Sequence, residues 1–85
     1  MANFFKNNRM KAELNAIIYR IDSNLSNNYK DAAQDDLKEL DKRFNEMVAV
    51  GELSDKLRVQ YEVKLSAYKT KMKGFTHKDQ KATWT

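Results

Sequence analysis

Apolar residues recur every three or four positions along three stretches of the sequence, the spacing of one face of an α-helix. The first stripe consists of Met10, Leu14, Ile17, Ile21 and Leu25. The second consists of Tyr29, Ala33, Leu37, Leu40, Phe44 and Met47. The third consists of Leu57, Tyr61, Leu65, Tyr68 and Met72, with Phe75 just beyond it. The pattern predicts three helices and therefore an all-α protein.

Residues that favour helix ends divide the three stretches. Gly51 follows the second stripe, and glycine adopts the left-handed conformation that commonly closes a helix. Ser54 is suited to cap the third helix, with Asp55 in its first turn, and Asn28 is suited to cap the second. We therefore predict a tight helical hairpin closed at Gly51.

The outer ends are marked less sharply. Asn3 or Asn8 is a candidate cap for the first helix, which should run to about Leu25. Gly74 should end the third helix, with lysines in its last turn. These ends give one bundle domain at residues 1–75 and a C-terminal tail at residues 76–85.

The stripes also predict how the helices pack. Along two antiparallel helices, the residue number rises on one helix as it falls on the other, so the numbers of facing residues add up to a nearly constant value. Ile17 with Leu37 and Leu14 with Leu40 meet this condition. Short links between antiparallel helices are usual in bundles, so the expected fold is an up-down-up three-helix bundle. In an alternative arrangement, the polar link 24–28 acts as a hinge, and the first helix is exchanged with a second copy to give a homodimer.

Composition narrows the class of protein. The 85 residues include no proline and no cysteine. The absence of cysteine excludes disulfides, thiol nucleophiles and thiolate metal sites. The first residues are not followed by the apolar run of a signal peptide, and no apolar run is long enough to span a membrane. We expect a cytoplasmic protein.

Charge is unevenly distributed along the chain. Residues 1–30 carry five basic and two acidic side chains, and residues 64–85 carry six lysines and one acid. Residues 31–51 carry six acidic and three basic side chains, so the middle helix is acidic. Such asymmetry is typical of an interaction segment, but it equally indicates pairing between oppositely charged neighbouring helices.

The sequence contains little that indicates an enzyme. His77 is the only histidine and lies beyond the third stripe. There is no Glu-x-x-His metal motif and no glycine-rich phosphate loop. We therefore expect no catalytic residues, cofactor, metal or small-molecule substrate.

Some apolar residues are left over once the core is assigned. Val59, Val63 and Ala67 form a second line on the third helix, and Tyr19 lies away from the main stripe of the first helix. A helix that is apolar on two sides often has a second packing partner. These four residues are candidates for contact with a protein, either a second copy or another chain.

A lysine-rich segment follows, with aromatic residues interleaved. Its candidate nucleic-acid-binding residues are Lys69, Lys71, Lys73, Lys78 and Lys81. Lysines neutralise phosphates and aromatic rings stack on bases, but no arginine follows Arg58 to read guanine. The matching stripes imply antiparallel packing rather than the crossed helices of a helix-turn-helix.

The hairpin turn resembles that of short helical hairpin modules, including bacterial C-terminal hairpin domains, on the residues Leu40, Phe44, Met47, Gly51, Leu53 and Ser54. The cysteine-free composition, rich in lysine and asparagine, is similar to that of small bacterial or phage proteins. The first hypothesis is a non-catalytic interaction or regulatory protein that presents helix faces. The alternatives are a weak nucleic-acid-binding accessory protein and a mobile-element or phage inhibitor of a larger enzyme.

Overall fold

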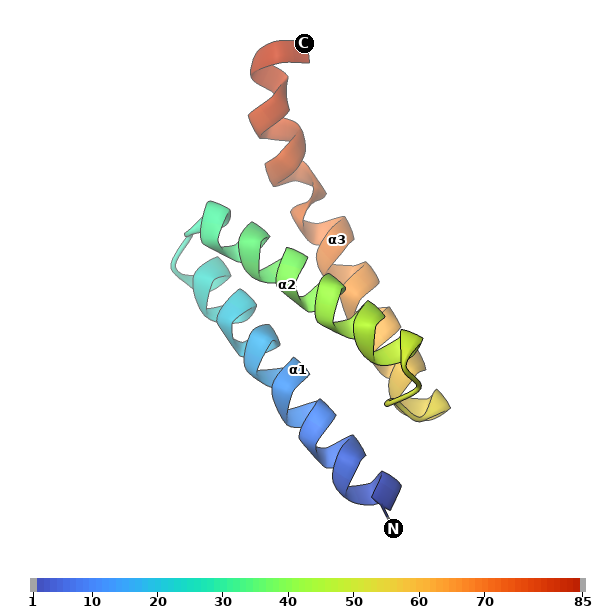
Figure 1. The fold of residues 1–85 in the computed structure, drawn as a ribbon. Coiled ribbons are helices and arrows are strands. Elements are labelled where there is room, and N and C mark those ends of the chain that lie inside the picture. Colours follow the sequence, from blue (N-terminus) through green and yellow to red (C-terminus); the bar gives the residue numbers. More distant parts are fainter. Residues whose placement is uncertain (1, 85) are drawn as a thin grey trace.

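The computed structural model describes the backbone of residues 2–84 and the side chains of residues 7–73. It contains three helices, α1 (Ala2–Ser26), α2 (Lys30–Ala49) and α3 (Asp55–Trp84), which run up, down and up (Figure 1). The predicted all-α three-helix bundle is therefore confirmed.

The core consists of the predicted stripes. The buried apolar residues are Met10, Leu14, Ile17, Ile21, Ala33, Leu37, Leu40, Phe44, Met47, Leu57, Tyr61, Leu65 and Met72. Leu25 and Tyr68 are only partly buried and pack against this cluster. Tyr29 is exposed, so its assignment to the second stripe was wrong. It precedes α2 and has non-helical dihedral angles, so the helical period does not set the direction of its side chain.

The two interhelical turns have the same geometry. Gly51 has φ 72°. The N–H of Gly51 donates to the carbonyl of Val48, and the N–H of Glu52 donates to the carbonyl of Met47. Asn28 has φ 61°, and the N–H groups of Asn28 and Tyr29 donate to carbonyls of the last turn of α1 in the same way. Both are Schellman turns closed by a left-handed residue. Gly51 is confirmed in its predicted role.

Asn28 has a different role from the one predicted. An N-cap residue has β-region dihedral angles, whereas the left-handed Asn28 closes the preceding helix. The residue that caps α2 is Tyr29, which makes no side-chain capping hydrogen bond. Ser54 does cap α3, since its Oγ accepts a hydrogen bond from the N–H of Leu57 at 3.3 Å.

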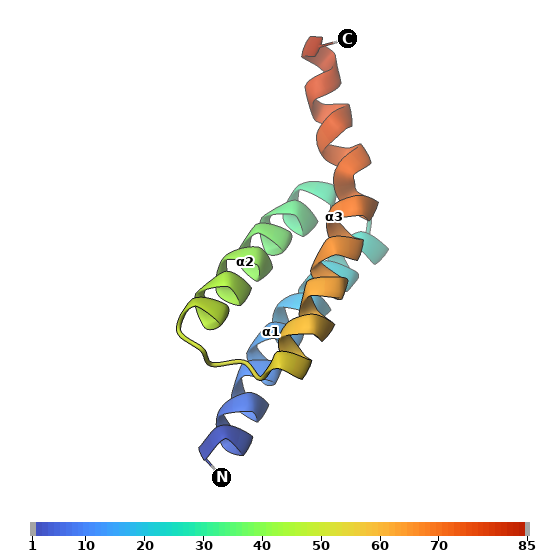
Figure 2. The ribbon, with the colours of Figure 1, turned by 90° about the vertical axis from the view of Figure 1, so that its right-hand side faces the viewer.

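The outer helix ends lie beyond the predicted ones. α1 begins at Ala2, so neither Asn3 nor Asn8 caps it, because nothing between them breaks a helix. α3 continues through Gly74 to Trp84 (Figure 2), because one glycine costs a helix only about 1 kcal/mol. The division at residues 75 and 76 stays a prediction, since Phe75 and the side chains after it lie outside the described residues.

The helices differ in how closely they pack. α2 runs between α1 and α3 in the view of Figure 1, and it packs most extensively on α1. α1 and α3, which are parallel, approach each other less closely than either approaches α2. Within the described part of the chain, no helix is both long enough and apolar enough to cross a membrane.

Candidate functional site

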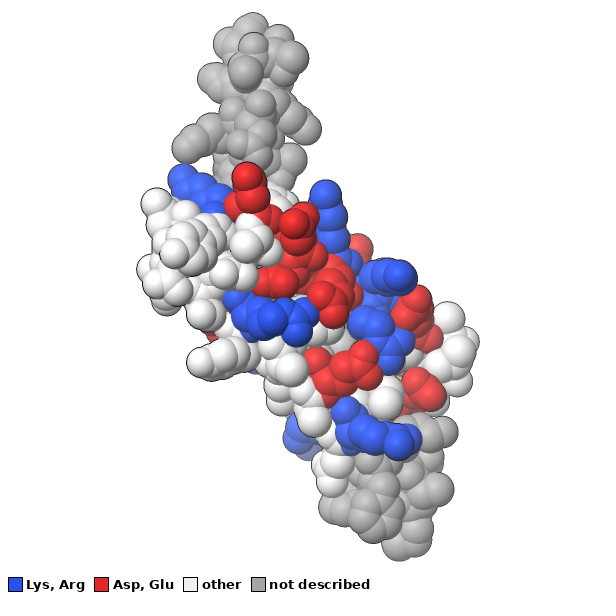
Figure 3. Space-filling view, turned by 60° about the vertical axis from the view of Figure 1, so that its left-hand side comes forward, with Lys and Arg blue, Asp and Glu red and all other residues white. Residues whose placement is uncertain are grey.

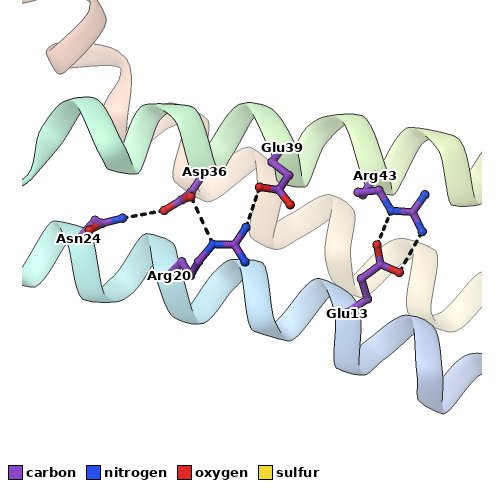
Figure 4. Close-up of polar contacts among 6 residues, drawn as sticks. All are labelled: Glu13, Arg20, Asn24, Asp36, Glu39 and Arg43. Atoms are coloured by element: carbon purple, nitrogen blue, oxygen red, sulfur yellow. Dashed lines mark hydrogen bonds and ion pairs between the residues drawn. The ribbon is translucent and has the colours of Figure 1, made fainter.

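The acidic side chains of α2 are mostly engaged by α1. Arg20 contacts Asp36 at 3.4 Å and Glu39 at 2.6 Å, and Asn24 donates to the other oxygen of Asp36 at 2.7 Å (Figure 4). The hydrogen bonds that Arg20 donates to Glu39 and Asp36 raise the pKa of Arg20. These two acids therefore connect α2 to α1.

A second arginine lies further along the same interface. Arg43 of α2 contacts both carboxylate oxygens of Glu13 on α1, with Nη2 at 2.9 Å from Oε1 (Figure 4). Arg43 also pairs with Glu46 of α2 at 2.7 Å. The hydrogen bond from Arg43 lowers the pKa of Glu13, and the two carboxylates raise the pKa of Arg43. A bidentate guanidinium fixes the relative position of two helices more strictly than a lysine would.

Two tyrosines connect α3 to α1. The hydroxyl of Tyr61 donates to Oδ1 of Asn15 at 2.7 Å, and the hydroxyl of Tyr68 donates to Asp22. Burial raises the pKa of Tyr61. Burial and the hydrogen bond to Asp22 raise the pKa of Tyr68 to about 12. The parallel pair α1 and α3 is thus bridged by long side chains.

α2 and α3 border a surface depression in the hairpin. Its lining residues are Asp41, Phe44, Asn45, Glu62, Leu65, Ser66 and Lys69. Lys69 pairs with Asp41 at 3.3 Å, and Asn45 also donates to Asp41 at 3.1 Å. The pair of Lys69 with Asp41 thus connects the two helices of the hairpin across this depression.

The candidate protein-contact residues are all exposed. Val59 and Val63 are 50% and 63% exposed, and Tyr19 is 74% exposed. Ala67 is also exposed. Val59, Val63 and Ala67 lie one turn apart on α3, on the side away from the buried Leu57–Met72 stripe. The structure gives these residues an accessible surface, and their role in binding stays a prediction.

The candidate nucleic-acid-binding lysines are in different surroundings. Lys69 is paired with Asp41, whereas Lys71 and Lys73 are exposed and no described carboxylate forms an ion pair with them. Lys71 lines a depression together with Asp22, Leu25 and Ser26. The side chains of Lys78 and Lys81 lie outside the described residues.

No further site comes from groups that could bind a metal ion within residues 7–73 or from comparison with known proteins. Among the side chains of residues 7–73, no group of three or more His, Cys, Asp or Glu residues is placed to hold a metal ion. Comparisons with protein-family models, with curated proteins and with solved structures found no match for this chain.

The sequence reasoning missed the individual ion pairs between α1 and α2. It allowed for pairing between oppositely charged neighbouring helices, but it named no individual pair. The predicted register of the two helices could have identified the ion pair of Glu13 with Arg43. The residue numbers of this pair add up to nearly the same value as those of Ile17 and Leu37, so the two residues should face each other. The charged pairs thus flank the apolar contacts along one interface.

Proposed function

We propose that this chain is a small, non-catalytic protein-interaction or regulatory module that acts through helix faces. The observation that carries the proposal is the exposure of Val59 and Val63 on α3. Their side of the helix is not needed for the core, which uses the Leu57–Met72 stripe. Aligned apolar side chains at helical spacing are a common basis for helix-to-helix recognition.

The arrangement of charges supports the same reading. Asp36, Glu39, Asp41 and Glu46 are occupied in ion pairs, so the acidic helix contributes mainly to the fold. The exposed apolar residues of α3 are Val59, Val63 and Ala67, and they lie among both basic and acidic side chains, such as Lys64 and Glu62. Such a surface is suited to binding and offers no described pair of groups positioned for acid/base chemistry.

The test uses the double variant Val59→Asp/Val63→Asp, with Val50→Asp as a control at an equally exposed valine in the α2–α3 turn. A pull-down from the source cell and light-scattering mass determination are performed on all three proteins. We expect the double variant to lose its partner or its dimeric mass, and the control to retain both. Unchanged partners and mass in the double variant, with its helicity intact, would contradict the proposal.

A second candidate function is weak nucleic-acid binding through the lysine-rich segment. The observation in its favour is that Lys71 and Lys73 are exposed and have no described carboxylate in ion-pair contact. The affinity for nucleic acid should then fall steeply as the salt concentration rises. It should also fall in the double variant Lys71→Gln/Lys73→Gln. Partner capture by the Val59/Val63 surface should be insensitive to that substitution.

A further inference from the structure

α3 is the helix that packs least closely on the rest of the molecule. The backbones of α1 and α2 approach each other most closely, those of α2 and α3 less closely, and those of α1 and α3 least. In native proteins, the segments that open locally are those with the lowest density of contacts. Among the three helices, α3 is therefore the one most suited to separate from the other two.

Ion pairs join α1 and α2 to each other without the participation of α3. Arg20 of α1 contacts Asp36 and Glu39 of α2, and Arg43 of α2 contacts both carboxylate oxygens of Glu13 on α1. Acidic and basic side chains adjoin one another over the face of the molecule shown in Figure 3. Because none of these five residues belongs to α3, all of these ion pairs remain if α3 moves away.

The polar contacts that attach α3 to the other helices are made at the ends of side chains. They include Tyr61 with Asn15, Tyr68 with Asp22, Lys69 with Asp41, and Gln34 with the carbonyl of Met72. The ion pair of Lys69 with Asp41 joins two partly exposed side chains, and pairs of this kind contribute little to stability. The guanidinium of Arg58 pairs with Glu62 inside α3, so this ion pair does not attach the helix to its neighbours.

Apolar burial sets the free-energy cost of opening. α3 supplies Leu57, Tyr61, Leu65 and Met72 to the shared core, and α1 and α2 supply the rest of the buried cluster. When α3 separates, these side chains and part of the apolar surface of α1 and α2 become accessible to water, which is unfavourable. The open form is therefore a minor state of the native protein.

The link at residues 50–54 provides a hinge for this movement. Val50 is 67% exposed, and no atom lies within 4 Å of a Cβ built on Gly51, so surrounding side chains do not hold this part of the link. Leu53 is the link residue that packs on the core. Glycine also changes its backbone conformation at little steric cost, which a hinge requires.

We propose that α3 opens from the molecule as one unit about the link 50–54, while α1 and α2 remain paired as a folded hairpin. The hydroxyls of Tyr61 and Tyr68 help to hold α3 closed against α1, and opening uncovers the apolar side of the α1–α2 hairpin. Val59 and Val63 lie on the outer side of α3 and are accessible in both forms, so the opening is independent of the proposed function.

Native-state hydrogen exchange of the full chain tests the opening. Exchange is followed for each amide by NMR, under conditions in which its rate reports the opening equilibrium. The amides of residues 61–68, in the described part of α3, are compared with the slowest amides of α1 and α2. After correction for intrinsic rates, we expect the α3 amides to exchange at least about tenfold faster, because they open without global unfolding.

Two double variants distinguish this opening from global unfolding. Arg20→Gln/Arg43→Gln removes ion pairs that both the closed and the open form contain. It should therefore accelerate exchange in α1 and α2 by about fivefold, and in α3 by less than about twofold. Tyr61→Phe/Tyr68→Phe removes hydrogen bonds that only the closed form contains, so exchange should accelerate about fivefold or more in all three helices.

Two results would overturn the opening of α3. One is equal or slower exchange of the α3 amides relative to the slowest amides of α1 and α2. The other is equal acceleration of all three helices by Arg20→Gln/Arg43→Gln, which would mean that the molecule opens only by unfolding completely. If this double variant does not fold, as judged by its helicity, the single variant Arg20→Gln gives the same comparison with a smaller expected effect.

Discussion

The Tyr61 hydroxyl donates to Asn15, and the same contact recurs two helical turns later between Tyr68 and Asp22, each pair 46 positions apart in the sequence. The equal offset follows from the parallel course of α1 and α3, since seven residues advance each helix by about two turns. The tyrosines therefore fix both the distance and the register between two helices whose backbones make few close approaches.

Removing one tyrosine hydroxyl should measurably destabilise the fold. We expect Tyr61→Phe to lower the free energy of unfolding by about 1 kcal/mol, because Asn15 loses its donor while the ring stays buried. Urea unfolding of Tyr61→Phe, Asn15→Ala and the double variant gives the coupling between the two residues. The control is Tyr19→Phe at an exposed tyrosine, and an equal loss there would show that the hydrogen bond contributes nothing.

Alkaline pH should destabilise the protein through Tyr68. Its pKa is raised from 10.0 to about 12, chiefly by burial and also by the hydrogen bond to Asp22, so the folded state favours the protonated phenol. This stabilisation is complete below pH 10 and is lost as the pH rises toward about 12. Unfolding free energies and tyrosinate absorbance, measured across that window, should show a weaker dependence on pH in Tyr68→Phe. Identical slopes for the two proteins would contradict the assignment.

Acid should weaken the α1–α2 interface through Glu13. The hydrogen bond from Arg43 lowers the pKa of Glu13 below 4.5, so the carboxylate stabilises the fold above that pH. The contribution is lost as the pH falls through the lowered value. Glu13→Gln should therefore flatten the acid limb of stability against pH. Glu62→Gln serves for comparison, because among the described side chains Glu62 forms its ion pair within α3, with Arg58, and should change that limb less.

The two central leucines should tolerate truncation poorly. Leu40 and Leu65 are buried, so Leu40→Ala and Leu65→Ala are each expected to cost about 2–5 kcal/mol. Val63→Ala removes two methyl groups from the exposed side of the same helix and should be nearly neutral. Thermal and urea unfolding report all three, and a near-wild-type Leu65→Ala would contradict the assigned core.

The left-handed turn residues should respond in opposite directions. Gly51→Ala is expected to cost about 1 kcal/mol, because alanine disfavours a φ of 72° although no atom lies within 4 Å of the added Cβ. Asn28→Gly should be neutral or slightly stabilising, since glycine occupies that conformation more readily than asparagine. Chemical denaturation of both variants checks the signs, and a stabilising Gly51→Ala would be inconsistent with this turn.

The sequence predicted the features that depend on local periodicity. The stripe from Leu37 to Met47 and the closing glycine at Gly51 followed from spacing and from one conformational preference. Asn28 was misassigned because asparagine favours both a helix N-cap and a left-handed C′ position, and composition does not distinguish them. Only the backbone hydrogen bonds of the turn do so.

The surface could be predicted only in part. The exposure of Val59 and Val63 followed from their place opposite the core stripe. The separation of α1 from α3 did not, because no stripe encodes the distance between these two helices. The hydroxyls of Tyr61 and Tyr68 span that distance, yet in the sequence both residues read only as members of the core.

The extensive packing of α2 on α1 bears on how the chain folds. Each helix packs mainly on its neighbour in the sequence, and the two links are only a few residues long. Closing such short loops costs little chain entropy, so the topology has low contact order and favours rapid folding. We therefore expect the α1–α2 hairpin to assemble first and α3 to dock on it afterwards, with Tyr61 and Tyr68 then bonding to α1.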